Sequence, residues 1–444
     1  MQALLARLSP HDFRSPIIFR IEPATRPRYR EIEKCRICGN LDLQPIVSLG
    51  EQTLSGIFPR GLQAAPAQGP LELVVCTAAG GHNACGLVQL CQSYDPQEMF
   101  GPTYGYRSAQ EPSVVRHLQA TVAQLLARVP LQAGDLVLDI GSNDDTLLSF
   151  YPRENLTAVG FDPAGRIFAG DDRADIQLVP DFFSAEIFRQ NFGKRQARII
   201  TSIAMLQDLE DPLEFMQEIA SILEPEGICH FETNYLPAMV RQNAYDTICH
   251  EQLAYYSLRQ IKWLTDRSGL KIIAVECNQS HGGSLAVTVA RRDSAHPENS
   301  AQVADLLRAE ESAGLTNVAE QQAFRSAVGQ HKTELPWLLH ALTSEGRKVI
   351  GLGSSTSGNV LLQHCEITVD VLPVIAETDP NKIGCRTPGT NIPIVSDSEA
   401  RASHPDYLLV LQWHEREEVI RREAEFLALG GKLIFPLPTV EVVG

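Results

Sequence analysis

Short apolar runs alternate with helical patterns through the middle of the chain. Residues 113–128 have the period of a helix, and a buried strand follows from Asp135. Further strands are predicted at Leu156–Phe161, Ala197–Ser202 and Gly227–Glu232, with a helix at Pro212–Leu223. Strands that alternate with helices form a parallel, doubly wound α/β sheet. We expect this sheet to be closed by an antiparallel pair, Leu270–Cys277 and Ser284–Ala290.

A second α/β unit is predicted after a polar linker at Arg291–Ser300. A long helical stretch, Ala301–Ser344, leads into a strand, a turn rich in Gly and Ser, and a helix across residues 348–359. A smaller parallel sheet is completed by strands at Leu372–Glu377, Tyr407–Gln412 and Lys432–Phe435. The chain therefore has two sheet edges of the kind at which open α/β sheets bind ligands.

The first strand ends in a sharp polar turn, from Val137 to Thr146. Asp139 and Gly141 stand at its carboxyl end, and a helix is expected to begin near Thr146, so backbone N–H groups would face a ligand. A second carboxylate, Asp162, ends the next strand, at about the distance in sequence at which a carboxylate binds ribose hydroxyls. The pattern indicates a site for a nucleoside cofactor.

Negative charge in this turn discriminates between cofactors. The dinucleotide fingerprint has glycines where the backbone approaches a pyrophosphate, but this chain has Asn143, Asp144 and Asp145 there. Carboxylates repel phosphate, and they tolerate the ammonium, sulfonium and ribose hydroxyls of S-adenosylmethionine (SAM). We therefore predict SAM as the cofactor. The alternatives are a nicotinamide cofactor and two ordinary strand ends with solvated Asp residues.

Composition bounds the remaining possibilities. At 444 residues the chain is too long for one core and should contain two or three domains. A net charge of −16 opposes the phosphate backbone of nucleic acid, so the expected partner is a small molecule and not RNA or DNA. No apolar run approaches the length of a membrane span, and the apolar core of the N-terminus is too short for a signal peptide. We expect a cytoplasmic protein without membrane association.

Four of the ten cysteines are paired by their spacing. Cys35 and Cys38 form a C-x-x-C knuckle, and Cys76 and Cys85 follow at the ends of two short apolar runs. Four thiolates in two pairs make a tetrahedral Zn²⁺ site with no position open for water, which predicts a structural zinc. Four reduced, buried cysteines are the alternative. Substitutes for one ligand could be His82 or Cys91.

The Gly-Ser turn of the second unit suits a different ligand. Hydroxyls and backbone N–H groups at a helix N-terminus suit a phosphate. Two cations, Lys382 and Arg386, could reach a pyrophosphate. The candidate contacts in the turn are Ser354, Ser355, Thr356 and Asn359.

Several motifs, in one order along the chain, resemble those of the bacterial sugar C-methyltransferases that act on nucleotide-linked 4-keto-6-deoxysugars. They are Cys35-x-x-Cys38, Leu71–Cys76 with Cys85–Leu90, Tyr104–Ser108, Asp139–Asp144, Tyr245–Gln252, His281–Ser284, Gly353–Asn359 and Arg386–Pro393. The resemblance extends from about Cys35 to Val442 and implies a class I SAM methyltransferase Rossmann-like domain, a small zinc-binding domain and a second Rossmann-like α/β domain. The implied parts are an extension (residues 1–33), a zinc-binding domain (34–110), the methyltransferase domain (111–297) and a C-terminal domain for the nucleotide sugar (298–444).

The same resemblance implies a reaction and its residues. A base removes the proton beside the 4-keto group, and the enolate carbon, C3 in our prediction, takes the methyl group of SAM. Tyr106 is expected among the pocket aromatics and as a candidate donor to the enolate. The implied cofactor contacts are Tyr104, Ser108, Asp139, Gly141, Ser142, Asn143, Asp162, Pro163 and Gln207.

This chain departs from the family pattern at three positions. The family's general base is a His where this chain has Gln252, and a carboxamide has no useful proton affinity near neutral pH. The glycine of the SAM loop is Asp145, and a Lys of the Gly-Ser turn is Ser357. Gln252 can still hydrogen-bond a sugar oxygen. The candidates for the base are therefore Glu251, then His250 and His281.

The leading hypothesis is an enzyme that methylates carbon of a dTDP- or GDP-linked keto-deoxysugar, working as a monomer or homodimer. O-methylation of a sugar or another small metabolite is the second hypothesis, since a base other than imidazole would suffice. The third is a homologue that binds SAM or a nucleotide sugar without catalysis, because the expected base is absent.

Overall fold

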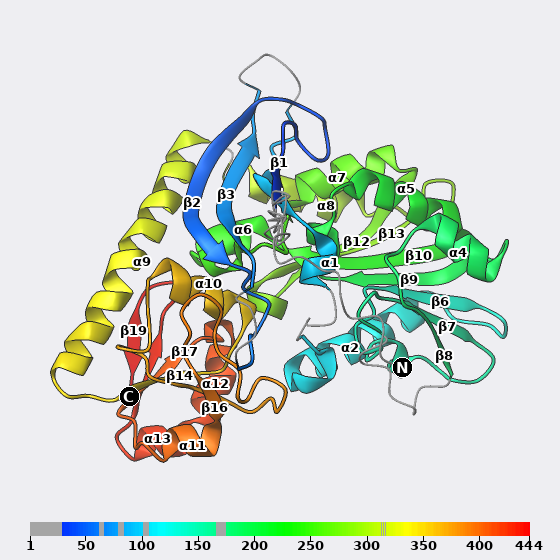
Figure 1. Ribbon diagram of the computed structural model, residues 1–444. Coiled ribbons are helices and arrows are strands. Elements are labelled where there is room, and N and C mark those ends of the chain that lie inside the picture. The colour runs from blue at the N-terminus through cyan, green and yellow to red at the C-terminus, as the bar shows by residue number, and fades with distance from the viewer. Residues whose placement is uncertain are drawn as a thin grey trace, which may run out of the picture.

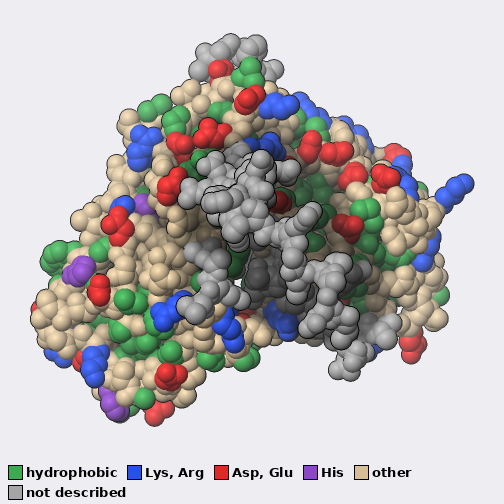
Figure 2. All heavy atoms as spheres, viewed as in Figure 1, with side chains coloured by type: hydrophobic (Ala, Val, Ile, Leu, Met, Phe, Trp, Pro, Cys, Tyr) green, Lys and Arg blue, Asp and Glu red, His purple; other side chains and the backbone are tan. Residues whose placement is uncertain are grey.

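The structure is a computed structural model that describes residues 29–61, 66–78, 84–100, 106–165, 175–311, 313, 315 and 317–444. Two α/β sheets and one antiparallel sheet form three parts of the molecule (Figure 1). No helix among the described residues is both long and apolar enough to span a bilayer. Figure 2 shows acidic and basic side chains interspersed over the described part of one face, and not a continuous basic surface.

The N-terminal part is an antiparallel sheet with the strand order β11-β4-β3-β2. Its strands are β2 (Leu43–Thr53), β3 (Gln68–Cys76), β4 (Val88–Leu90) and β11 (Ala254–Tyr255). A separate ladder joins β1 (Tyr29–Glu31) to β5 (Gln92–Tyr94), and α1 (Pro96–Met99) follows. Strand β11 comes from the central part of the chain, so the two parts share a sheet.

The central part is a seven-stranded sheet with the order β12-β13-β10-β9-β6-β7-β8. Its strands are β6 (Leu136–Ile140), β7 (Thr157–Phe161), β8 (Ile176–Val179), β9 (Ala197–Ile203), β10 (Leu223–Asn234), β12 (Leu270–Asn278) and β13 (Ser284–Arg291). Strands β6 to β10 run parallel, and β13 lies antiparallel to both β10 and β12. The predicted doubly wound sheet and its closing pair are confirmed.

Helices cover both faces of this sheet. Successive residues of a strand point to opposite faces, and in these strands the residues on both faces are apolar and need to be buried. In β6, Leu138 packs into the core beneath α5 and α7, and Val137 packs into the core beneath α2. The helices are α2 (Pro112–Arg128), α4 (Ala185–Phe192), α5 (Pro212–Ile222), α6 (Leu236–Arg241) and α7 (Leu258–Arg267).

The C-terminal part is a six-stranded sheet with the order β16-β15-β14-β17-β18-β19, parallel except for β19. Its strands are β14 (Val349–Leu352), β15 (Ile375–Glu377), β16 (Ile394–Ser396), β17 (Tyr407–Val410), β18 (Lys432–Phe435) and β19 (Glu441–Val443). Its helices are α9 (Val318–Ser344), α10 (Thr356–His364), α11 (Asp397–Arg401), α12 (Arg416–Arg422) and α13 (Ala424–Ala428). Helix α9 packs against both β14 and β2, so it joins this part to the N-terminal part (Figure 1).

Two sequence predictions were wrong. No α-helix begins near Thr146; only a short 3₁₀ helix, η2 (Leu148–Phe150), follows β6. The turn instead contains left-handed residues, Asn143 (φ 54°) and Asp145 (φ 60°), which cannot continue into a helix. The SAM loop therefore lacks the helix N-terminus that we expected.

The predicted long helix is two helices, α8 (Ser300–Glu310) and α9. A new helix begins after the break because the Asn317 side chain caps α9 by accepting a hydrogen bond from the Glu320 N–H, and Leu315 between the two helices is fully buried. Helix α8 packs against α7 and β12 of the central sheet.

Candidate active site

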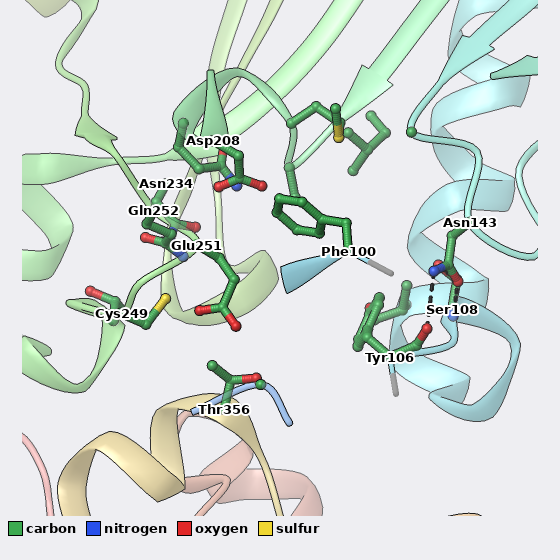
Figure 3. A pocket seen from close by; sticks show the side chains of 18 of the residues that line it. Phe100, Tyr106, Ser108, Asn143, Asp208, Asn234, Cys249, Glu251, Gln252 and Thr356 are labelled. Atoms are coloured by element: carbon green, nitrogen blue, oxygen red, sulfur yellow. Dashed lines mark hydrogen bonds between the residues drawn. The ribbon is translucent and has the colours of Figure 1, made fainter. Parts of the chain in front are cut away.

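One cavity of about 550 Å³ lies where all three parts of the molecule meet. The carboxyl ends of β6, β7 and β9 line one side, and the turn before α10 lines another. Cys249, Glu251 and Gln252 line the side opposite Asn143 (Figure 3), and Gly56 of the N-terminal part also lines the cavity. The two ligand sites that the sequence predicted separately therefore open into one space.

Carboxylates concentrate at the β6 and β7 side of the cavity. Thr201 donates a hydrogen bond to Asp139 (Oγ1 to Oδ1, 2.6 Å), and the N–H groups of Asn143 and Ala164 donate to Asp162 (2.8 and 2.7 Å). Burial, together with the charges of Asp145 and Asp162, raises the pKa of Asp139 to about 8. A positively charged ligand would relieve this repulsion, so these carboxylates fit the sulfonium and ammonium groups of SAM.

The turn is closely packed at Gly141 and offers the Ser142 hydroxyl as a group that could bind a ligand. Gly141 has a left-handed φ of 76°, and a Cβ there would collide with the side chain of Met205. The buried Ser142 hydroxyl has no hydrogen-bond partner among the described residues. Pro163 and Gln207, two other predicted cofactor contacts, also line the cavity.

Asn143 fastens a neighbouring segment to this turn. Its amide donates to the Tyr106 carbonyl (3.0 Å) and accepts from the Ser108 N–H (3.0 Å), as Figure 3 shows. Ser108 begins the 3₁₀ helix η1 (Ser108–Gln110), and Tyr106 lies two residues before it. Both residues line the cavity. Asn143 thus positions other predicted contacts as well as lining the cavity.

Glu251 is the predicted base that the structure brings to the cavity. Its side chain points toward Thr356 across the cavity (Figure 3), and Gly56 lies so close to its carboxylate that a Cβ would collide with Oε1. Burial raises the pKa of Glu251, although its own N–H, the Cys249 thiol and the Gly56 N–H oppose that effect. A carboxylate with a raised pKa is a better proton acceptor than one in water.

Gln252 lies beside Glu251 with its amide held in place. The Asn234 side chain donates to its Oε1 (2.9 Å), so the Gln252 NH₂ group is left as the donor at the cavity wall. This geometry suits a hydrogen bond to a substrate oxygen and cannot supply a base.

Sequence reasoning missed Asp208, the last residue of the 3₁₀ helix η4 (Leu206–Asp208). It lines the cavity beside Asn234 and Gln252 (Figure 3). Burial, and then the negative charge of Glu251, raises the pKa of Asp208 well above its ordinary value. The only available sequence signal was its place just after the β9 strand.

Several hydrogen-bond donors of the turn before α10 already have partners within the protein. Glu377, at the end of β15, accepts from both the N–H and the hydroxyl of Ser354, and Ser355 caps α10 by accepting from the Gly358 N–H. Thr356 and Ser357 line the cavity, as does Lys382, whose Nζ donates to the Ser354 carbonyl (3.0 Å). Thr356, Ser357 and Lys382 are therefore the groups still able to bind an anion here.

Three predicted site residues lie away from the cavity. His250 is fully buried against the Tyr94 ring (centroids 4.7 Å apart) and does not line the cavity, so its imidazole does not face a substrate there; burial also lowers its pKa to about 4. Asn359 donates to the Ser55 carbonyl (2.8 Å) and so joins α10 to the N-terminal part. Arg386 is exposed and donates to the Asn391 carbonyl (2.9 Å). Tyr104, His82 and the His281 side chain lie outside the described residues.

A candidate metal centre lies apart from the cavity. The sulfurs of Cys35, Cys38, Cys76 and Cys85 all lie within 4.8 Å of one another, and the nearest pairs are 3.4 and 3.5 Å apart. In a tetrahedral site with Zn–S bonds of about 2.3 Å, the sulfurs lie about 3.8 Å apart, so the cluster fits zinc. Cys91 is not a member of this cluster.

Known families match all three parts of the chain. Residues 35–100 match a model of a zinc binding domain, residues 114–275 a methyltransferase domain, and residues 279–438 a C-methyltransferase C-terminal domain. The chain is 30% identical over 417 residues to the C-methyltransferase NovU from Streptomyces niveus, which covers 93% of this chain and 97% of NovU.

Solved structures resemble part of the chain. The cyclopropane synthase MmaA2 from Mycobacterium tuberculosis is 13% identical to this chain, with a TM-score of 0.33. The match covers 44% of this chain and 91% of the MmaA2 chain. The CurJ carbon methyltransferase is 11% identical and covers 41% of this chain and 56% of its own, also with a TM-score of 0.33. The methyltransferase model and the observed strand order identify a class I SAM methyltransferase fold with a zinc site in its N-terminal part.

We expect one Zn²⁺ per chain, measured by metal analysis of the purified protein. Cys35→Ser should lower the free energy of unfolding by about 2–4 kcal/mol, because loss of a metal ligand is among the most damaging single changes. SAM affinity in the folded fraction should stay nearly unchanged, since the cluster does not line the cavity. A zinc-free protein with an intact fold would contradict the prediction.

We expect Asp162→Ala to weaken SAM binding by about 1.5–3 kcal/mol in calorimetry, the scale of charge-assisted hydrogen bonds. Asp175→Ala is the matched control, because Asp175 forms an ion pair with Arg153 at the surface. Equal SAM affinity of both variants, or binding of NAD and not SAM, would refute the assignment.

Proposed function

The chain belongs to the C-methyltransferase family, and on that premise we propose that this SAM-dependent enzyme methylates carbon, at C3, of a nucleotide-linked 4-keto-6-deoxysugar. The observation that carries the proposal is that one cavity opens onto both predicted ligand sites. The cavity is lined by the acidic ends of β6 and β7, by the turn before α10, and by Glu251 and Gln252. A nucleotide sugar could place its reactive sugar beside Glu251 and Gln252 while its phosphate groups contact the turn before α10.

In the proposed reaction SAM supplies an electrophilic methyl group. Glu251 takes the proton from the carbon beside the keto group, and the electrons of that C–H bond form the enolate. The new C–C bond then forms as the S–CH₃ bond breaks, which releases S-adenosylhomocysteine, and Glu251 returns its proton to solvent. A positioned base contributes about 10²–10⁴-fold to such a step.

Two features of the site support these roles. The Gln252 NH₂ group is fixed by Asn234 as a donor at the cavity wall, where it could bind a sugar oxygen. Thr356 and Ser357 begin α10, where N–H groups and the helix dipole favour an anion, and Lys382 adds a positive charge. These groups are our candidates for binding the pyrophosphate.

The test is incubation with SAM and a panel of dTDP- and GDP-linked 4-keto-6-deoxysugars. We expect one substrate to gain one methyl group in the mass spectrum, with NMR assigning the new carbon–carbon bond to C3. A methyl group on oxygen would favour the O-methyltransferase hypothesis. Binding of SAM and sugar without product would favour the non-catalytic one.

Glu251→Gln should abolish exchange of the proton beside the keto group into deuterated water, even without SAM, because the amide cannot accept that proton. Glu186→Gln, an exposed residue in the first turn of α4, is the control. In the wild type, the exchange rate should rise with pH and level off once Glu251 is ionised, above the ordinary Glu pKa of about 4.3, because burial raises its pKa. Normal exchange by Glu251→Gln would exclude Glu251 as the base.

Gln252→His should raise the same exchange rate, by up to about 10²–10⁴-fold for a well-placed imidazole. The comparison is made at neutral pH with equal substrate occupancy of both proteins. If the variant is no faster while the wild type turns over briskly, Gln252 is not a weakened base, and the pocket uses a different proton acceptor or carries out a different reaction.

A further inference from the structure

The carboxyl group of Asp208 also faces the cavity, beside that of Glu251. Asp208 follows β9 and Glu251 lies in the segment before β11, and both line the cavity (Figure 3). In each, one carboxyl oxygen is buried without a hydrogen-bond partner among the described residues: Oδ1 of Asp208 and Oε2 of Glu251. Buried polar atoms are normally paired, so both oxygens are candidates for contact with a ligand.

The backbone fixes the two groups relative to each other. The Leu253 N–H donates to the Gln207 carbonyl (2.8 Å), which joins the chain two residues after Glu251 to the residue before Asp208. The Gln207 side chain accepts from Thr233 (3.0 Å), and the Tyr256 hydroxyl donates to the Leu206 carbonyl (3.3 Å). Asp208 is thus held on a turn that is fastened on two sides.

Hydrogen-bond donors distinguish the two carboxyl groups. The ionised form of Glu251 is stabilised by the Gly56 N–H, its own N–H and the Cys249 thiol. Among the described residues no such donor offsets the burial of Asp208, and the charge of Glu251 adds to the penalty, so the pKa of Asp208 is well above its ordinary value. A third carboxyl, that of Asp246, also lines the cavity with its Oδ1 buried and unpaired among the described residues, but its Oδ2 accepts from the Trp413 indole N–H (2.7 Å). These surroundings favour a proton on Asp208 over a proton on Glu251.

We propose that Asp208 works as a neutral acid that donates a hydrogen bond to the carbonyl oxygen of the substrate, while Glu251 removes the proton from the adjacent carbon. This inference rests on the proposed function. As the C–H bond breaks, its electron pair forms the C=C bond and the carbonyl π electrons move to oxygen, where the Asp208 O–H meets the developing charge. The Asp208 proton stays on Asp208. A donor that is already oriented toward such an oxygen strengthens as charge develops.

Substitutions that keep or remove a donor separate this role from that of a second base. Asp208→Asn keeps an N–H donor and should retain exchange within about tenfold of the wild type, whereas Asp208→Ala should lose about 10²–10³-fold. Glu251→Gln should lose exchange altogether. Asp211→Asn, three residues away at the N-cap of α5, is the matched control, because Asn caps a helix as well as Asp does. If Asp208→Asn lost as much as Glu251→Gln, the donor role would be refuted.

A second measurement does not depend on turnover. The infrared difference spectrum of wild type minus Asp208→Asn, taken at neutral pH without substrate, should contain the carbonyl stretch of a protonated carboxylic acid. A carboxylate band in its place would overturn the proposal. If the acid band is present and no keto sugar exchanges or is methylated, the proposed function fails while the ionisation of the pair stands. If exchange is brisk and the acid band is absent, the Asp208 role alone fails.

Discussion

The pairing of β11 with β4 is the constraint on which the geometry of the site depends. Ala254 and Tyr255 lie opposite Gln89 and Val88, so the central part of the chain completes a sheet of the N-terminal part. The residue before this strand is held on both sides: the Leu90 N–H donates to the Leu253 carbonyl, and the Leu253 N–H donates to Gln207. Because Glu251 and Gln252 come directly before Leu253, these main-chain hydrogen bonds fix the backbone from which their side chains extend.

The cysteine cluster reaches this ladder through Arg36, which lies between Cys35 and Cys38. Its guanidinium is almost fully buried and donates to the carbonyls of Leu90 (2.6 Å) and Leu253 (3.3 Å). A knuckle held by zinc keeps Arg36 in place, so the metal can support the frame of the active site without touching the cavity. This gives a structural zinc a physical reason to accompany the chemistry.

Buried acids give the cavity its character. Removing a carboxylate from water is costly unless donors or a cation replace the lost hydration. At the ends of β6 and β7, main-chain N–H groups and a hydroxyl supply part of that replacement, and a cationic cofactor would supply the rest. Among the described residues no donor or cation compensates Asp208 in this way, and its raised pKa favours the protonated form. Different surroundings can thus give similar side chains in one cavity different roles.

The amino-acid sequence determined the elements and the local chemistry: the strands of both α/β sheets, the four paired cysteines, the acidic turn after β6 and the helix N-terminus at Thr356. These follow from hydrophobic period and residue spacing, which are local properties. It could not determine that Asp145 and Asn143 would take left-handed conformations instead of starting a helix, nor that Glu377 would occupy the donors of Ser354. Only the tertiary structure decided that His250 is buried against Tyr94, that Asp208 joins Glu251, and that Gly56 closes the wall, because burial and charge at each position depend on segments distant in the chain.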